Sequence, residues 1–394
     1  MNPTELYRCW VEVSFNALRG NLAWIRGRVG RRAKILAVVK ADAYGHGLPQ
    51  IAGALMQGGV DIFGVATLGE ALGVRAVGAG WPILLLGSSL PAEIEATVRH
   101  NIMPTISSLD EARRFQREAA RQKKSLPVHV KVDTGMGRLG FWHEEAVAPI
   151  RRIAAMPNLR LEGIYTHFPS AEDDVAFSLE QVERFRRVLH QLAAPHPSAT
   201  MRHQPPMRIP LRHAENSAGL LSVREGRPRL GRLFNVVRPG LAYWSCQPTL
   251  PSVAGLQPTL SFKSRVILVK RITAGCSISY GRTFVADRPM RVAIVGAGYG
   301  DGYSRALSNR AQVLIRGRRC RVLGRVTMDQ TIVDVSEPVF RDLLVGEEVV
   351  LLGAQGREAI TATEVAAWEE TIPWEVLTSI TKRVPRVYIG ATSA

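Results

Sequence analysis

Three cationic side chains stand inside or at the end of short apolar runs of this sequence. Lys40 closes ILAVVK, Lys131 lies within VHVKVDT and Arg238 closes VVR. An ammonium is unfavourable in apolar surroundings unless it is paired or loses its proton, and a neutral lysine amine is a nucleophile for carbonyl groups. Lys40 is therefore a candidate for Schiff-base chemistry. Taken alone, it also fits a lysine that extends past its strand end into water.

Other polar residues lie at or just beyond the ends of comparable runs, and their types serve in acid–base and anion-binding sites. These candidates are Asp42, Tyr44, Asp133, Arg138, Tyr165, His167, Asn216 and Ser217. In a barrel of parallel strands the catalytic groups lie at the carboxyl ends of the strands. We therefore expect these side chains to converge.

The elements that must position these residues alternate between β-like and helical patterns. Apolar, β-branched runs occupy 35–40, 62–67, 83–87, 103–107, 128–134, 161–168, 208–217 and 236–241. Between them, apolar residues recur at three- and four-residue spacing, and Ser108 and Glu111 open one such helix with the spacing of a capping box. Eight strands alternating with helices predict an α/β fold, a (β/α)8 barrel of the TIM type. A doubly wound sheet is the alternative, but no GxGxxG follows the first run.

A second domain is expected after the Pro-, Ser- and Gly-rich stretch CQPTLPSVAGLQPTL. We place the barrel at residues 1–245 and a C-terminal β-rich domain at 246–394. β-like runs follow one another there without regular helices between them. One helix, TATEVAAWEE, and a last strand, PRVYIG, complete the pattern. Such a succession predicts an all-β domain.

Composition excludes several classes of protein. The chain has 394 residues, of which 46% are hydrophobic and 22% charged, so it has material for a large core and is not globally disordered. No apolar run approaches the roughly 20 residues of a membrane span, and MNPTELYRCW does not have the pattern of a signal peptide. Four cysteines, Cys9, Cys246, Cys276 and Cys320, form no CxxC pair. We expect a cytoplasmic protein without a metal site and without membrane attachment.

The charge is strongly positive, with 51 Lys and Arg residues against 34 acidic ones and a net charge of +17. An anionic partner such as nucleic acid is one interpretation. However, the excess is divided among separate Arg-rich stretches, and there is no RNP motif, Cys/His finger or aromatic–basic pattern. We expect solvated helix faces and no nucleic-acid partner. Only the cluster Arg316, Arg318, Arg319 and Arg321 remains a candidate anion patch.

Motifs along nearly the whole chain resemble those of the alanine racemase family of pyridoxal-phosphate enzymes. They occur in the order VVKADAYGHG, KVDTGMGRLGF, THF, HAENSAG, VRPG, SYGRTF, GAGYGDGYSR, GRVTMDQ and TIPWEVLTSITKRVPR. The resemblance implies a pyridoxal-phosphate barrel followed by a β domain, which the N-terminal strand at about 9–15 joins. It also implies the interconversion of L- and D-alanine, which supplies D-alanine for peptidoglycan.

The resemblance assigns a cofactor site for pyridoxal 5'-phosphate. Lys40 would form the Schiff base with it, and Arg238 would face its pyridine nitrogen. Because a guanidinium keeps its proton, that nitrogen would stay unprotonated and the ring would be a weaker electron sink. His167 would orient Arg238. The residues implied for the phosphate are Tyr44, Ser217, Gly240 and Leu241.

Racemisation needs proton exchange at both faces of the α-carbon, which favours two bases on opposite sides. Lys40 is the first, and the resemblance implies Tyr280 of a second subunit as the other. A phenol titrates near about 10, so Tyr280 needs nearby cations to act as a base. The resemblance therefore implies a homodimer in which each active site is shared between subunits.

Further residues are implied around the substrate. Arg138 would contact the substrate carboxylate, and Lys131 matches a lysine that many members carry as a carbamate. The second subunit would contribute Met328 and Asp329. Trp374 stands where the family usually has a tyrosine that binds the phosphate, so cofactor affinity and substrate range are in question.

Three alternatives stay open beside an alanine racemase. A racemase of the same family with broad specificity would also accept amino acids such as serine. A non-catalytic pyridoxal-phosphate-binding protein has a related barrel, but it does not have the β domain and the opposite-face tyrosine. A decarboxylase of the same fold type would need a cysteine–aspartate pattern that this sequence does not show.

Overall fold

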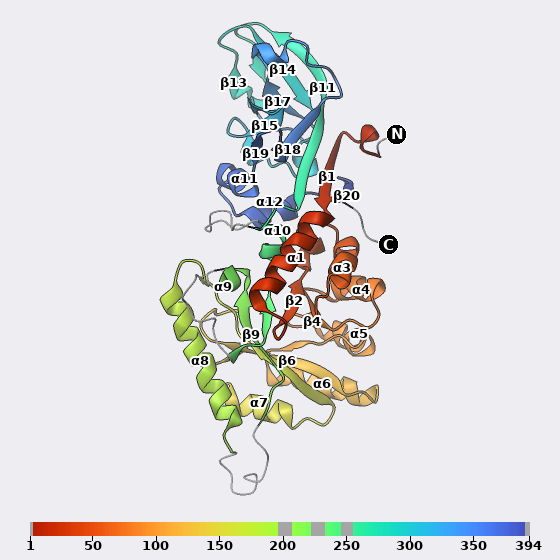
Figure 1. Cartoon of the computed structure of the whole chain (residues 1–394), viewed down its shortest axis with the longest axis vertical. Helices are drawn as coiled ribbons and strands as arrows, with labels where there is room; N and C mark the ends of the chain where they lie inside the picture. Colours follow the sequence, from red (N-terminus) through yellow and green to blue (C-terminus); the bar gives the residue numbers. More distant parts are fainter. Residues whose placement is uncertain (1–2, 196–206, 222–232, 246–254, 391–394) are drawn as a thin grey trace. The chain divides into compact units, whose positions relative to one another are not determined.

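The computed structural model of the chain describes residues 3–195, 207–221, 233–245 and 255–390 (Figure 1). Cys246 and most of the predicted linker lie outside these ranges. The chain divides into two compact units. The barrel unit comprises Leu22–Ala43 and Leu48–Ala242, and the β unit comprises Met1–Asn21, Tyr44–Gly47 and Tyr243–Ala394.

The barrel unit contains the eight predicted parallel strands. They are β2 (Lys34–Val38), β3 (Ile62–Val65), β4 (Ile83–Leu85), β5 (Thr105–Ile106), β6 (Leu126–Asp133), β8 (Leu159–Tyr165), β9 (Leu211–Asn216) and β10 (Val236–Arg238). Their order in the sheet is β4-β3-β2-β10-β9-β8-β6-β5, with the short β7 (Phe141–Trp142) beside β6. A parallel bridge between Leu84 and Met103 joins the two ends of this order. The predicted (β/α)8 barrel is confirmed.

Helices surround these strands, as Figure 1 shows. They are α1 (Phe15–Val29), α3 (Leu48–Gln57), α4 (Leu68–Val77), α5 (Ile94–Arg99), α6 (Leu109–Arg121), α7 (Val147–Ala154) and α8 (Val175–Ala193). Apolar faces of α6, α7 and α8 pack on β6 and β8, with Phe115, Ile150 and Phe185 fully buried between them. The apolar residues that recur at three- and four-residue spacing in the sequence therefore form the core between these helices and the sheet.

The predicted capping box of α6 is only half formed. Ser108 Oγ accepts the backbone N–H of Glu111 at 3.1 Å, as an N-cap should. The Glu111 carboxylate does not return to Ser108; it accepts the backbone N–H groups of Ser107 at 2.8 Å and Ser89 at 3.1 Å. The Glu111 side chain thus connects the loop at Ser89 to the start of α6. Spacing in the sequence cannot predict a contact between residues so far apart.

The β unit is built around long antiparallel strands. Its elements are β1 (Cys9–Ser14), β11 (Leu260–Ile272), β12 (Ser277–Ile278), β13 (Phe284–Val285), β14 (Met290–Val295), β15 (Gln312–Ile315), β16 (Arg318–Arg321), β17 (Thr331–Asp334), β18 (Glu348–Gln355), β19 (Glu358–Ile360), β20 (Arg386–Ile389), α11 (Ala362–Glu369) and α12 (Pro373–Ser379). β1 pairs antiparallel with β11 and parallel with β20, so the N-terminal strand is part of this sheet. α12 was not predicted; Pro373 starts it at a position where a missing N–H is tolerated.

Two further expectations bear on the surface. Within the described ranges, no helix is both long enough and apolar enough to span a bilayer. In the candidate anion patch, Arg316 pairs with Asp342 and Glu347, and Arg319 pairs with Glu358 and Glu364. Because these arginines already have carboxylate partners, the patch is weaker than the sequence indicated.

Candidate active site

The predicted residues of the barrel unit gather at the carboxyl ends of its strands. Lys40 follows β2, Lys131 lies near the end of β6, His167 follows β8, Ser217 follows β9 and Arg238 ends β10. Arg138, Gly240 and Leu241 lie in the adjoining loops. The parallel strands therefore bring together residues that are about 200 positions apart in sequence.

Lys40 is followed by a turn with left-handed backbone conformation. The four residues after Lys40, Ala41–Tyr44, have φ between 51° and 54°, the left-handed region. Each costs about 1–2 kcal/mol for a residue with a Cβ, so the surroundings must stabilise the turn. Asp42 Oδ1 accepts the N–H of Leu48 at 2.7 Å, and Tyr44 is buried at the end of the turn.

Glu70 was not among the predicted site residues, yet it supports the same turn. Its carboxylate accepts the N–H of Ala41 at 2.6 Å and that of Ala66 at 2.8 Å, and it forms a capping box with Thr67 at the start of α4. Burial and the charge of Arg138 lower the pKa of Lys40, and Glu70 partly opposes them. The Thr67–Glu70 spacing signals a helix start but not this second contact.

Arg238 is buried, and its hydrogen bonds go to imidazoles and backbone carbonyls. Nη1 bonds His213 Nδ1 at 2.7 Å. Nη2 donates to the carbonyls of Thr166 at 2.8 Å and Ala214 at 3.0 Å, and it lies 3.1 Å from His167 Nδ1. Burial lowers the pKa of Arg238 to about 10, which leaves the guanidinium protonated at neutral pH. The arginine that was predicted to face a cofactor nitrogen is thus held rigidly.

Two buried histidines, neither of which was predicted as a site residue, extend this network away from Arg238. His213 Nε2 lies 2.9 Å from His129 Nδ1. Burial, followed by the positive charge of Arg238, lowers the pKa of His213 far below its usual range and that of His129 to about 3. Both imidazoles are neutral, so the charge behind the site belongs to Arg238 alone.

Lys131 is 2% exposed, an unusual environment for an amine. Burial, with the charges of Arg138 and Arg238, lowers its pKa to about 8. Asp133, which opposes this shift, accepts the N–H of Gly135 at 2.8 Å in the loop that leads to Arg138. A substantial fraction of Lys131 is therefore neutral near pH 8, the form that can react with carbon dioxide.

The residues after β9 and β10 form a small turn around the Ser217 hydroxyl. Ser217 Oγ accepts the N–H of Gly240 at 2.9 Å and that of Ala242 at 3.1 Å. Backbone N–H groups that point toward one place, beside a hydroxyl, are the kind of donors that a phosphate oxygen accepts from. Pyridoxal phosphate has three parts that need partners. The Lys40 amine, whose pKa is lowered, suits the aldehyde; the buried Arg238 guanidinium suits the ring nitrogen; and the turn around Ser217 suits the phosphate. The donor set fits the cofactor that the resemblance implies.

The other predicted residues belong to the β unit. Tyr280 follows β12 and is 74% exposed, and Met328 is also exposed. Asp329 accepts from Arg383 at 2.7 Å, and Trp374 is the second residue of α12 and half-buried. These four residues therefore belong to a different unit from the barrel cluster.

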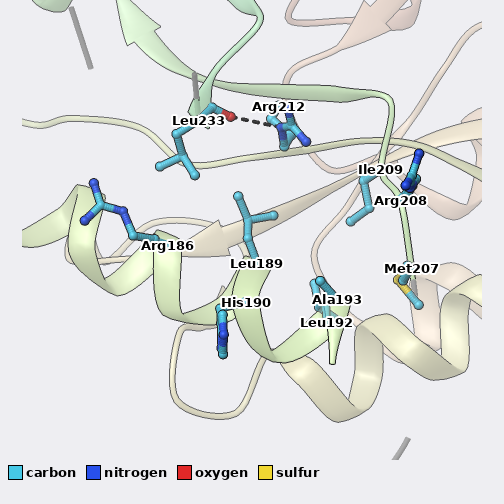
Figure 2. A pocket seen from close by; sticks show the side chains of 10 residues that line it. All are labelled: Arg186, Leu189, His190, Leu192, Ala193, Met207, Arg208, Ile209, Arg212 and Leu233. Atoms are coloured by element: carbon cyan, nitrogen blue, oxygen red, sulfur yellow. Dashed lines mark hydrogen bonds between the residues drawn. The ribbon is translucent and has the colours of Figure 1, made fainter. Parts of the chain in front are cut away.

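Two hollows in the barrel unit contain none of the predicted residues. One, of about 350 Å³, lies between α8 and the residues leading into β9; Arg212 Nε donates there to the carbonyl of Leu233 (Figure 2). The other, of about 520 Å³, is lined by residues near the starts of the strands, among them Lys34 and Pro82. The candidate site rests on its polar cluster and not on either hollow. The described residues contain no group of three or more His, Cys, Asp or Glu side chains that could hold a metal ion.

The fold and the cluster define a class: a (β/α)8 barrel with a lysine of lowered pKa and a buried arginine at the carboxyl ends of its strands. Comparison with known proteins narrows the class. The models of the alanine racemase N-terminal and C-terminal domains match residues 13–248 and 259–388. The alanine racemase of Carboxydothermus hydrogenoformans is 41% identical over 384 residues, which cover 96% of this chain and 99% of that protein. The chain belongs to the alanine racemase family.

Solved structures agree with this assignment. The alanine racemase of Clostridium difficile 630 superposes with a TM-score of 0.87 at 31% identity, covering 97% of this chain and 96% of that one. The alanine racemase of Bartonella henselae, solved with covalently bound pyridoxal phosphate, gives a TM-score of 0.85 at 28% identity, covering 97% and 100%. The family resemblance seen in the sequence motifs is confirmed.

Proposed function

We propose that the chain is a pyridoxal-phosphate-dependent racemase that interconverts L- and D-alanine and thereby supplies D-alanine for peptidoglycan. The observation that carries the proposal is the cluster at the strand ends, where a lysine of lowered pKa, a buried arginine and a phosphate-type turn lie on one face of the barrel. Pyridoxal phosphate, when bound, supplies the electron-withdrawing group that makes the α-proton of an amino acid acidic.

Each residue then has a defined task. Lys40 would hold the cofactor through its amine, and that amine, once the substrate amine has displaced it, would exchange a proton at one face of the substrate. Ser217, Tyr44 and the N–H groups of Gly240 and Leu241 bind the phosphate. Arg238, oriented by His167, keeps the pyridine nitrogen unprotonated, because the guanidinium retains its own proton.

Substrate contacts complete the proposal. Arg138 binds the substrate carboxylate through a charge-assisted contact. A carbamate on Lys131 would place a negative charge beside Arg138, whose positive charge already lowers the pKa of this lysine. Met328 and Asp329 of a second subunit border the substrate. Trp374 takes the place of a tyrosine in the family, so the hydroxyl that this tyrosine would offer to the phosphate is missing.

The second proton exchange belongs to Tyr280 of a second subunit, so the active enzyme is a homodimer. A side chain as exposed as Tyr280 is available to a partner. Tyr299 and Ile372 of the β unit are also large, apolar and exposed. Exposed apolar side chains of this kind mark interaction surfaces when they are grouped.

The experiment combines absorbance with chiral analysis. Purified protein with added pyridoxal phosphate should absorb in the visible range and convert L-alanine to D-alanine much faster than it converts L-serine. Lys40→Ala should abolish both signals. Tyr280→Phe should keep the absorbance and lose racemisation, because it removes only a proton-transferring group.

The outcomes separate the alternatives. Equal conversion of serine would favour the racemase of broad specificity. Visible absorbance without turnover of any amino acid would overturn the catalytic proposal and favour a binding protein. No absorbance at all would contradict the cofactor assignment.

A further inference from the structure

Tyr165 lies in the middle of a row of functional side chains, and the proposed function gives it no task. In the sheet register, Lys131 of β6 pairs with Tyr165 of β8, which pairs with His213 of β9. The Tyr165 and His213 rings stack with centroids 4.6 Å apart and planes 6° apart. Arg238 Cζ lies 5.1 Å from the centre of the Tyr165 ring, and Lys131 Nζ lies 5.7 Å from it. One buried ring therefore contacts both cations of the site's inner wall.

The hydroxyl of Tyr165 has a separate role. It lies 2.8 Å from Thr105 Oγ1 and donates to the carbonyl of Leu86 at 3.3 Å. Thr105 itself donates to the carbonyl of Leu85 at 2.6 Å. These bonds attach the hydroxyl end of the ring to β5 and to the residue after β4, while the face of the ring contacts the two cations.

Asp133 acts electrostatically on Lys131 and Glu215 acts on Arg238, but neither carboxylate forms a salt bridge with its cation. Neither Lys131 nor Arg238 forms an ion pair within the described part of the chain. A buried cation without a carboxylate is unfavourable, and the negative face of an aromatic ring is an alternative partner that keeps a fixed geometry. Burial lowers the pKa of both groups, which shows that water does not fully solvate either charge.

We propose that Tyr165 is a positioning residue whose ring holds the Arg238 guanidinium in place. The inference rests on the proposed function, in which Arg238 faces the pyridine nitrogen of the cofactor. A change in the ring would then reach the cofactor's electronic state through Arg238.

The test compares Tyr165→Phe with Tyr165→Leu in the holoenzyme. Phenylalanine keeps the ring and loses the hydroxyl bonds; leucine loses the ring. We expect the visible spectrum of the bound cofactor between about pH 6 and pH 10 to be unchanged in the first variant and altered in the second. The leucine variant should also bind pyridoxal phosphate about fivefold or more weakly, the size of a lost cation–π contact in a dry site. Phe115→Leu, which removes a fully buried ring from α6, is the matched control for core damage.

Thermal melting of each variant separates stability from positioning. A purely structural Tyr165 would lower the melting temperature of the leucine variant but leave its cofactor spectrum identical to that of wild type at every pH. That result would overturn the inference, and so would equal spectral changes in the phenylalanine and leucine variants. Absence of visible absorbance in the wild-type protein would instead refute the proposed function.

Discussion

Burial sets the charge states of the residues in the candidate site. It lowers the pKa of Lys40, takes that of Lys131 to about 8 and leaves Arg238 protonated with a pKa of about 10. These residues were all recognisable in the sequence, because a cation at the end of an apolar run is uncommon. His213, His129 and Glu70 were not, because their roles depend on contacts between strands and loops far apart in sequence.

Ser217→Ala tests the phosphate turn at the residue scale. The variant removes the Ser217 hydroxyl, which accepts two backbone N–H groups. The same hydroxyl is proposed to donate a hydrogen bond to the phosphate. One such hydrogen bond contributes about 1–1.5 kcal/mol, so the dissociation constant for pyridoxal phosphate should rise about tenfold. Titration followed by visible absorbance measures it. Unchanged affinity would show that the phosphate binds elsewhere.

Glu369 on α11 should make stability depend on pH. Burial, with a contribution from the negative charge of Glu375, raises its pKa to about 7. The folded state thus holds this proton more tightly than the unfolded state, so stability falls as pH rises from about 4.5 to about 7 and then levels off. Glu369→Gln should stabilise the protein by about 1–3 kcal/mol at pH 8 and little at pH 4.5.

Urea unfolding of the Glu369→Gln variant and the wild type at the two pH values measures this difference. Asp287→Asn, at an exposed position, serves as control for the loss of one negative charge. A gain of the same size at both pH values, or a similar gain in the control, would contradict the assignment.

At the scale of elements, the sequence predicts the barrel strands well because each is a continuous apolar run bounded by helices. The left-handed turn Ala41–Tyr44 could not be predicted, since two alanines and a tyrosine are poor residues for it. Glu70 and Asp42 stabilise it by accepting the N–H groups of Ala41 and Leu48. The seven-residue α12 is too short for a periodic signal.

Gly298→Ala tests how two segments of the β unit hold Met328. Tyr299 and Gly300 donate to the carbonyls of Thr327 and Met328 at 3.0 Å and 2.8 Å, and a Cβ on Gly298 would collide with both carbonyls. The variant should lose about 1–3 kcal/mol of stability, as overpacked sites do.

Gly20→Ala is the matched control for this substitution. It lies in α1 with nothing within 4 Å of the added methyl, so it should be neutral or stabilising by about 0.5–1 kcal/mol. Chemical unfolding of both variants and the wild type measures the change in the free energy of unfolding. Equal effects of the two substitutions would mean that the close approach at Gly298 is not a constraint.

At the scale of the whole molecule, the net charge of +17 has no single location. Several arginines of the Arg-rich stretches pair with carboxylates on their own helix, as Arg114 does with Asp110 and Arg184 with Glu180. Such surface pairs contribute little to stability, typically about 0–1 kcal/mol each. These pairs do not remove the net charge, because the value of +17 already counts every carboxylate.

The central claim is that each active site needs Lys40 from one chain and Tyr280 from another. The most direct measurement mixes two inactive variants, Lys40→Ala and Tyr280→Phe, after dissociation and reassociation of the subunits. A dimer with one chain of each kind contains one site with both residues intact and one site with neither. Racemase activity should return to about a quarter of the wild-type value, because about half of the dimers are mixed and each mixed dimer has one working site. Formation of mixed dimers without any return of activity would contradict the shared site.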